Sequence, residues 1–313
     1  MTTLPQCISR FLGVASFITL AAFSTSGFAK TYALPTGGNA MIGQMDYVTS
    51  DSGETLLSIA QRYNLGLNAI EGANPGIGPI NILPAGMHIL VPTAHLLPPL
   101  ARDGIVINLP EMRMYYYPKS SRGIVMTFPI GIGRVGKTIP LAHTSVVRKQ
   151  EHPIWIPPDD IRAFNEEQGV TLPKIMKAGP DNPLGPYAIY LRIPTYLIHS
   201  TIYPDSIGRR ASFGCIRMNE ADIKDFFPLV SSGTPVTIVD MPNKIGWDNG
   251  TLYLESHPPL EEHAHEAYVG VGAIVNSIAD TSSPTTAFVD WQMVAYLAES
   301  PDGIPHAIGF RVR

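Results

Sequence analysis

The stretch at residues 198–219, "IHSTIYPDSIGRRASFGCIRMN", decides how this 313-residue chain is interpreted. It holds Cys215, one of only two cysteines, with Gly214 directly before it and Arg217 two residues after it. His199 lies upstream, in the strand-like run "TYLIHS". Such a cysteine has four possible roles: a buried small hydrophobe, half of a disulfide, a metal ligand or a nucleophile.

The N-terminus removes one of these roles. Arg10 precedes an apolar run at 11–23 that ends in small residues, a pattern typical of a secretory signal peptide. We expect residues 1–29 to be cleaved and the protein to reside in the periplasm; an uncleaved anchor is the alternative, although a span needs about 20 apolar residues. Cleavage removes Cys7, so Cys215 has no intramolecular disulfide partner.

A metal site at Cys215 is also disfavoured. No Cys-x-x-Cys or His-x-x-x-His spacing surrounds it, and zinc on a single cysteine would need three further ligands. A buried hydrophobe and a nucleophile therefore remain.

The composition indicates a soluble, loop-rich β protein. There are 29 prolines and 28 glycines, many for a helical bundle, and hydrophobic residues make up 45%. The net charge is −4, with 22 basic against 26 acidic residues spread thinly, so nothing suggests a nucleic-acid partner. The length allows two domains.

Residues 45–93 predict a small α+β unit. Apolar residues at helical spacing predict a short helix, and they are Leu56, Ile59, Ala60 and Tyr63. A second helix is expected over 67–73, and extended stretches at 47–49 and 88–91 flank the pair. The order is strand, helix, helix, strand.

The Pro-rich segment 94–102 predicts a linker to a mostly β domain over 103–240. Its expected strands include "GIVINLP", "RMYYYPK", "IVMTFPIGIG", "TSVVRKQ", "AIYLRI", "YLIHS" and "TPVTIVD". One helix is expected over 219–230, with Asn219 as its cap. Residues 155–188 form a long insertion, either a wall or lid of a site or a plain surface connection.

Several residues around Cys215 suit a nucleophile. A thiol with an ordinary pKa near 8.5 is mostly un-ionised at neutral pH, and the imidazole of His199 is a base that can take its proton. A backbone carbonyl such as that of Ser200 can orient the imidazole. Gly214 permits a tight turn and leaves the sulfur approachable, so that N–H groups including that of Cys215 can face a developing oxyanion.

Two further side chains complete the set. Ser212 can hydrogen-bond locally and fix the turn, and Arg217 can hold a substrate carboxylate through a bidentate fork. Together, in a secreted chain with a single mature thiol, these residues favour a nucleophile over a buried hydrophobe.

The segment 198–240 resembles the active-site segment of L,D-transpeptidases of the YkuD-domain family, whose pattern is His, a spacer, then Ser/Thr-x-Gly-Cys-x-Arg/Asn. The runs "INLPEMRMYYYP", "FPIGIGRVGKTIP", "AGPDNPLG" and "IGWDNGTLYLESHPPL" resemble the same family. The segment "SGETLLSIAQRYN" with "LPAGMHILVP" resembles the LysM module, whose members bind peptidoglycan or chitin.

The resemblance implies a β-sandwich-like catalytic domain, no metal or organic cofactor, and peptidoglycan as partner. It implies catalysis by Cys215 and His199 through a thioester on a tetrapeptide stem, with an amine of a second stem or an envelope lipoprotein as acceptor. It also implies substrate-binding or turn-shaping roles for Ser212, Gly214 and Arg217. Carbapenems acylate members of the family.

Two positions depart from the pattern. Phe213 stands where many members have His, which puts substrate preference in question. Ser200 stands where many members have Gly. Its side chain can alter how the His199 ring is held, so Ser200 is included in the candidate site. Transfer to water, as in an L,D-carboxypeptidase, and an inert peptidoglycan-binding protein remain alternative functions.

The C-terminal segment 241–313 predicts an appendage of unassigned role. Its histidines and glutamates fit no zinc spacing and predict a solvated acidic helix; they are His257, Glu261, Glu262, His263, His265 and Glu266. An amphipathic stretch follows near 286–300.

Overall fold

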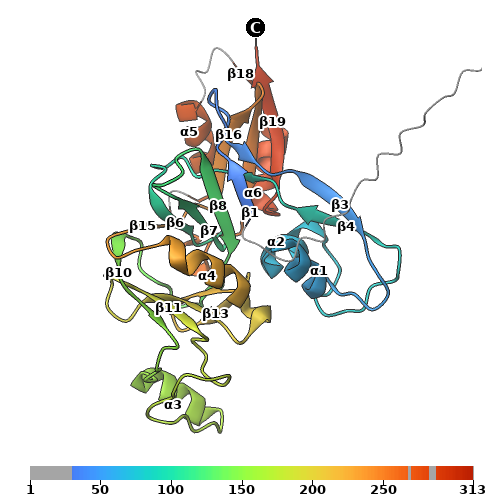
Figure 1. Cartoon of the computed structure of the whole chain (residues 1–313). Helices are drawn as coiled ribbons and strands as arrows, with labels where there is room; N and C mark the ends of the chain where they lie inside the picture. Colours follow the sequence, from blue (N-terminus) through green and yellow to red (C-terminus); the bar gives the residue numbers. More distant parts are fainter. Residues whose placement is uncertain (1–29, 267–268, 282–286, 313) are drawn as a thin grey trace, which may run out of the picture.

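The computed structural model describes residues 30–266, 269–281 and 287–312 (Figure 1). The predicted signal peptide at 1–29 lies outside the described residues. Within the described part, no helix is long and apolar enough to cross a membrane. Strands predominate, so the prediction of a mainly β protein is confirmed.

A nine-stranded sheet forms the centre of the molecule. Its spatial order is β1 (Lys30–Ala33), β8 (Ile124–Pro129), β7 (Arg113–Tyr117), β6 (Gly104–Asn108), β15 (Pro235–Val239), β10 (Ala142–Glu151), β11 (Tyr187–Leu191), β12 (Leu197–Ser200) and β14 (Ile216–Met218). Strand β10 pairs with β15 through its first half and with β11 through its second, with a register shift after Val146. Such a shift lets one strand serve two halves of a curled sheet.

Helix α4 (Glu220–Phe226) covers the main core. The Phe226 ring lies 5.2 Å from that of Tyr116 and 5.1 Å from that of Phe128. The predicted helix is shorter than expected and continues as a 3₁₀ turn, Phe227–Leu229, because Pro228 offers no N–H to an α-helical ladder. Asn219 lies at the cap position, but its side chain makes no capping hydrogen bond.

The N-terminal unit has the predicted strand–helix–helix–strand order. Strands β3 (Met45–Thr49) and β4 (His88–Pro92) pair antiparallel and flank α1 (Leu56–Tyr63) and α2 (Leu67–Ala73). Thr55 and Ser58 form a capping box at the start of α1.

This unit is docked on the central sheet domain. The amide of Asn64 donates to Asp222 at 2.8 Å, and the Leu67 N–H donates to the carbonyl of Ile207 at 3.0 Å. The linker segment 94–102 is itself packed, with Leu96 and Leu97 buried. It contains β5 (His95–Leu96), which pairs with β2 (Met41–Ile42), because its leucines are buried rather than solvated.

The C-terminal segment folds as a second sheet with two helices. The order of its strands is β16 (Asn243–Asp248), β17 (Thr251–Ser256), β19 (Pro305–Arg311) and β18 (Ala287–Val289). Helices α5 (Val271–Thr281) and α6 (Trp291–Glu299) pack on it, and α6 matches the predicted amphipathic stretch.

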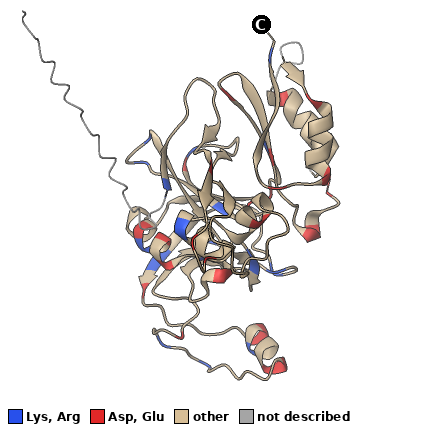
Figure 2. Ribbon diagram, turned by 90° about the vertical axis from the view of Figure 1, so that its right-hand side faces the viewer, with Lys and Arg blue, Asp and Glu red and all other residues tan. Residues whose placement is uncertain are grey.

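The insertion between β10 and β11 carries a helix that the sequence did not predict. Helix α3 (Asp159–Glu167) projects from the body with its loop in both views (Figures 1 and 2). None of its residues is buried, and several of them are acidic, shown by the red ribbon of Figure 2. Its amphipathic pattern is short and lies between Pro-rich segments, which hides it from periodicity arguments.

Candidate active site

The pairing of three strands puts the candidate catalytic residues on one face of the sheet. Ala188 of β11 pairs with His199 of β12, which pairs with Arg217 of β14. The adjacent row, Ile189, Ile198 and Ile216, points the other way into the main core. Because side chains alternate along a strand, His199 and Arg217 face away from that core.

Cys215 directly precedes β14 and joins the same face. It packs against a small apolar cluster that includes Leu197 and Ala188, on the side opposite the main core. Strands about 4.8 Å apart with about 3.3 Å per residue place the Cα atoms of His199 and Cys215 roughly 8 Å apart. Side chains that point to the same face can bridge that separation.

His199 is held as a neutral base. It is buried, and its Nδ1 lies 2.5 Å from the carbonyl oxygen of Ser200, the orienting acceptor that the sequence suggested. A carbonyl only accepts, so Nδ1 carries the proton and Nε2 is the basic nitrogen. The backbone of Leu184 is a second hydrogen-bond partner of the ring. Burial and the nearby guanidinium of Arg217 lower the pKa of His199 to about 4, so the imidazole is uncharged at neutral pH.

The Cys215 thiol is un-ionised at rest. Burial raises its pKa, while the Leu197 N–H and Arg217 act in the opposite direction. The thiol donates to the carbonyl of Thr195 at 3.7 Å, and Thr195 has a φ of +71°, which a β-branched residue rarely adopts. A neutral thiol and a neutral imidazole on one face of the sheet are the pair expected before proton transfer.

The turn before Cys215 is fixed by Ser212 and requires glycine. The Ser212 hydroxyl accepts from the Gly214 N–H at 3.0 Å and donates to the Cys215 carbonyl at 2.6 Å. Gly214 has a φ of +115°, and a Cβ on it would lie 2.7 Å from the Tyr196 ring. Since Ser212 takes the Gly214 N–H, the N–H of Cys215 is the better candidate for an oxyanion donor.

The hydroxyl of Ser200 is fully buried and committed to the main chain. It donates to the Leu184 carbonyl at 2.9 Å and accepts from the Tyr187 N–H at 3.0 Å, at the end of the insertion. Ser212 is similarly buried and bonded. Both hydroxyls therefore hold the main chain, which is the turn-fixing role suggested for Ser212, while a substrate contact of either side chain stays a prediction.

Arg217 supplies a positive charge on this face next to Cys215 and His199. Its guanidinium lies 5.7 Å from the centre of the Tyr203 ring, and its buried Nε has no hydrogen-bond partner among the described residues. A buried donor without a partner costs about 1–3 kcal/mol, which a bound anionic group would recover. This suits the predicted contact with a substrate carboxylate.

Phe213 links the nucleophile turn to the insertion. Its ring lies 5.2 Å from that of Phe164 in α3, and the guanidinium of Arg134 stacks on both rings. Lys137 adds an ion pair of 2.7 Å with Asp160. The residue that departs from the family pattern thus anchors the projecting helix beside Cys215.

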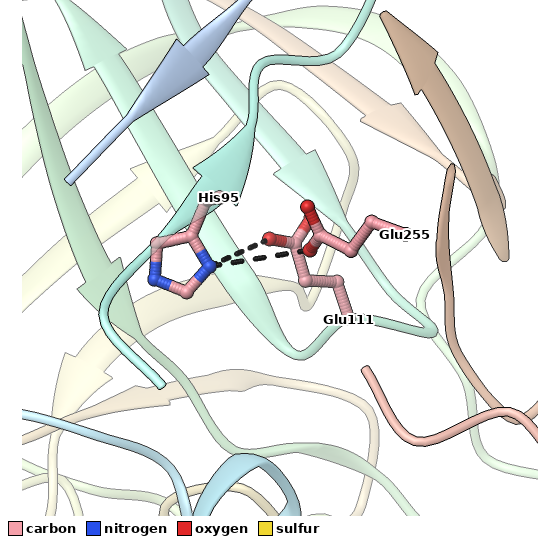
Figure 3. A group of neighbouring side chains, drawn as sticks. All are labelled: His95, Glu111 and Glu255. Atoms are coloured by element: carbon pink, nitrogen blue, oxygen red, sulfur yellow. Dashed lines mark ion pairs between the residues drawn. The ribbon is translucent and has the colours of Figure 1, made fainter. Parts of the chain in front are cut away.

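One buried group has the residue types of a metal site. Figure 3 shows His95 pointing toward the carboxylates of Glu111 and Glu255, with its Nδ1 at 3.9 and 4.0 Å from them. However, the ammonium of Lys244 lies 2.9 Å from Glu111 and 2.8 Å from Glu255 and also donates to Tyr115. The cation position between the carboxylates is filled by this lysine.

This cluster joins three parts of the chain. Glu111 follows β6, Lys244 and Glu255 belong to the C-terminal sheet, and His95 belongs to β5. Burial alone would raise the pKa of Glu111, but Lys244 and its other charged neighbours lower it to about 2. The cluster acts as an ionic joint between domains.

Comparison with known proteins identifies the family. The L,D-transpeptidase catalytic domain model matches residues 102–238, and the LysM domain model matches 51–92. The probable L,D-transpeptidase YcfS of Escherichia coli is 36% identical over 303 residues, with 95% of this chain and 94% of that protein covered. The chain belongs to the L,D-transpeptidase family.

Other L,D-transpeptidase relatives are at least as similar over shorter spans. The probable L,D-transpeptidase YbiS of Escherichia coli is 41% identical, covering 77% of this chain and 80% of that protein. The probable L,D-transpeptidase ErfK/SrfK of the same organism is 42% identical, covering 81% and 82%. Both resemblances inferred from the sequence, to L,D-transpeptidases and to LysM, are confirmed.

The depressed pKa of His199 predicts the acid limit of activity. As the pH falls, Nε2 is protonated only near pH 4. The value of kcat/KM for the acylating substrate should therefore stay constant at pH values well below 6.5 and decrease only near pH 4. An acid limb near pH 6.5 would contradict this environment for the base.

Replacing Gly214 by alanine should remove turnover while the protein stays folded. The new Cβ would meet the Tyr196 ring and the Lys137 carbonyl, and displacing the turn should cost about 100-fold in kcat. Gly233→Ala is the control: its φ is +86° with no atom within 4 Å, so it pays a similar backbone strain away from the site. Equal kcat values for the two variants would argue against the turn's role.

Replacing Lys244 by methionine should destabilise the fold. Two buried carboxylates would lose their cation, at a cost of about 3–5 kcal/mol in the free energy of unfolding, measured by denaturant titration. Lys119→Met, which removes an exposed pair with Asp103 at 3.7 Å, should change it by less than about 0.5 kcal/mol. Similar effects of both would contradict the ionic joint.

Proposed function

We propose that this protein is a periplasmic L,D-transpeptidase that acts on the tetrapeptide stems of peptidoglycan through a thioester on Cys215. The observation that carries the proposal is the shared sheet face of His199, Cys215 and Arg217, in a chain whose relatives are probable L,D-transpeptidases. Export by the signal peptide at 1–29 and acylation by carbapenems belong to the same proposal.

In the first half-reaction, the stem peptide acylates the Cys215 thiol. The Nε2 of His199 takes the thiol proton as the sulfur attacks the carbonyl between diaminopimelate and the terminal D-alanine. The C–N bond breaks, the imidazolium returns the proton to the leaving amine, and D-alanine departs. Arg217 pairs with a carboxylate of the stem, and the Cys215 N–H stabilises the oxyanion.

In the second half-reaction, an amine resolves the thioester. His199 takes a proton from the attacking amine and returns it to the leaving sulfur, so the enzyme ends unchanged. The acceptor is the side-chain amine of another diaminopimelate, which gives a 3→3 cross-link, or the terminal lysine of an envelope lipoprotein. Water as acceptor would make the protein a carboxypeptidase.

The LysM unit is proposed to bind the glycan strand. Its docking through Asn64 and Leu67 supports a fixed direction between a bound strand and Cys215. A strand held there would present its stems to the same face in one orientation, which raises their effective concentration at the thiol.

Product analysis tests this function. Purified protein incubated with a disaccharide-tetrapeptide should release D-alanine and form a cross-linked dimer, detected by mass spectrometry, and Cys215→Ala should form neither. Formation of the tripeptide without the dimer would show that the acyl group is transferred to water, so the reaction would be hydrolysis. No product, together with a thiol that a carbapenem leaves unmodified at neutral pH, would reduce the protein to a peptidoglycan-binding module.

A further inference from the structure

Two adjacent arginines precede the nucleophile turn and bind different domains. Arg209 pairs with Glu71 of α2 at 2.7 Å, on the LysM side. Arg210 donates to both carboxylate oxygens of Glu262 at 2.7 and 2.8 Å, on the side of the C-terminal segment. Both pairs join the segment between His199 and Cys215 to another domain, but only Arg210 also bonds to residues next to the turn.

The contacts of Glu262 differ from those of a solvated acidic residue, which the sequence predicted. Glu262 lies in the short 3₁₀ helix Glu261–His263, and besides Arg210 it accepts from the hydroxyl of Thr138. Arg210 in turn donates to Thr138 at 3.1 Å. The hydrogen bonds from Arg210 lower the pKa of Glu262 to about 2, so the carboxylate stays ionised.

The two segments that Glu262 ties together form the walls of the turn at Cys215. Arg210 begins β13 (Arg210–Ser212), which pairs with β9 (Ile132–Gly133). Arg210 also donates to the Gly133 carbonyl at 3.2 Å, and the Arg134 N–H donates to Ser212 at 3.0 Å.

The wall on the Thr138 side reaches the glycine of the turn itself. The Lys137 carbonyl lies 3.0 Å from where a Cβ on Gly214 would be, leaving no slack between that wall and the turn. A shift of either wall would move the sulfur relative to His199.

The pair between Arg210 and Glu262 suits this task better than its neighbour. Its side chains are 15% and 23% exposed, against 40% and 25% for Arg209 and Glu71. Both pairs are bidentate, which fixes orientation as well as distance, so the difference lies in exposure and in the further partners. Arg209 makes no side-chain contact with the turn in the described structure, whereas the partners of Arg210 include both walls.

We propose that Glu262, which comes from the C-terminal segment outside the matched catalytic domain, is a positioning residue for the nucleophile turn and acts through Arg210 and Thr138. The proposal rests on the function of Cys215 given above. It assigns a role in catalysis to a segment whose sequence predicts only an appendage.

The test compares Glu262→Gln with the matched control Glu71→Gln, which removes the same charge from the neighbouring arginine. For a disaccharide-tetrapeptide, Glu262→Gln should lower kcat about tenfold, with KM changed less than about twofold, because the turn is displaced while the substrate contacts remain. Glu71→Gln should match the wild type. Thermal unfolding should show that both variants are folded.

Alkylation of Cys215 by iodoacetamide at neutral pH separates this proposal from the proposed function, because it needs no stem peptide. The rate should fall several-fold in Glu262→Gln and in Arg210→Lys, which keeps the charge but loses the bidentate fork. Equal alkylation rates and kcat values in Glu262→Gln and Glu71→Gln would overturn the proposal, and so would a rise in KM alone. If alkylation is slower in Glu262→Gln but the wild-type protein does not turn over the stem peptide, the positioning role of Glu262 is supported and the proposed transpeptidase function is refuted.

Discussion

The parallel pairing of β12 with β14 is the constraint on which the site depends. It aligns His199 with Arg217 and brings Cys215 to the same face, two residues before that arginine. A shift of one residue would turn His199 toward the core, because side chains alternate along a strand. The isoleucines at 198 and 216 oppose that slip, since both are fully buried in the main core. Hydrophobic burial on one side of the sheet thus sets the placement of the candidate catalytic residues on the other.

The domains around this sheet also hold the site. The LysM unit contacts the segment between base and nucleophile, and the C-terminal segment reaches it through Glu262. The insertion reaches it from a third side through Phe164 and Phe213. The ionic cluster at Lys244 ties the C-terminal sheet to the central domain, and Glu262, the partner of Arg210 from this segment, follows that sheet's strand β17. The accessory parts are structurally continuous with the active site.

The sequence predicted what is local and missed what depends on tertiary contacts. The spacing of His199, Gly214 and Cys215 and the strand–helix–helix–strand order are short patterns with a direct physical reading. The packing of the linker at 94–102 was not predicted, because its prolines indicate an open connection while Leu96 and Leu97 are buried. Glu262 was misread as solvated because its partner Arg210 lies 52 residues away. The helix in the insertion was missed because its amphipathic pattern is short, and the edge-to-face contact of Phe164 with Phe213 was missed because it joins distant segments.

The central claim is that the imidazole of His199 removes the proton from Cys215 to form a thioester. Intact-protein mass spectrometry after acid quenching of a reaction with a tetrapeptide stem tests it most directly. The account predicts an adduct equal to the stem without its D-alanine, located on Cys215, and formed about 100- to 10,000-fold more slowly in His199→Ala. Turnover without such an adduct, an adduct on another residue, or an undiminished rate in His199→Ala would contradict it.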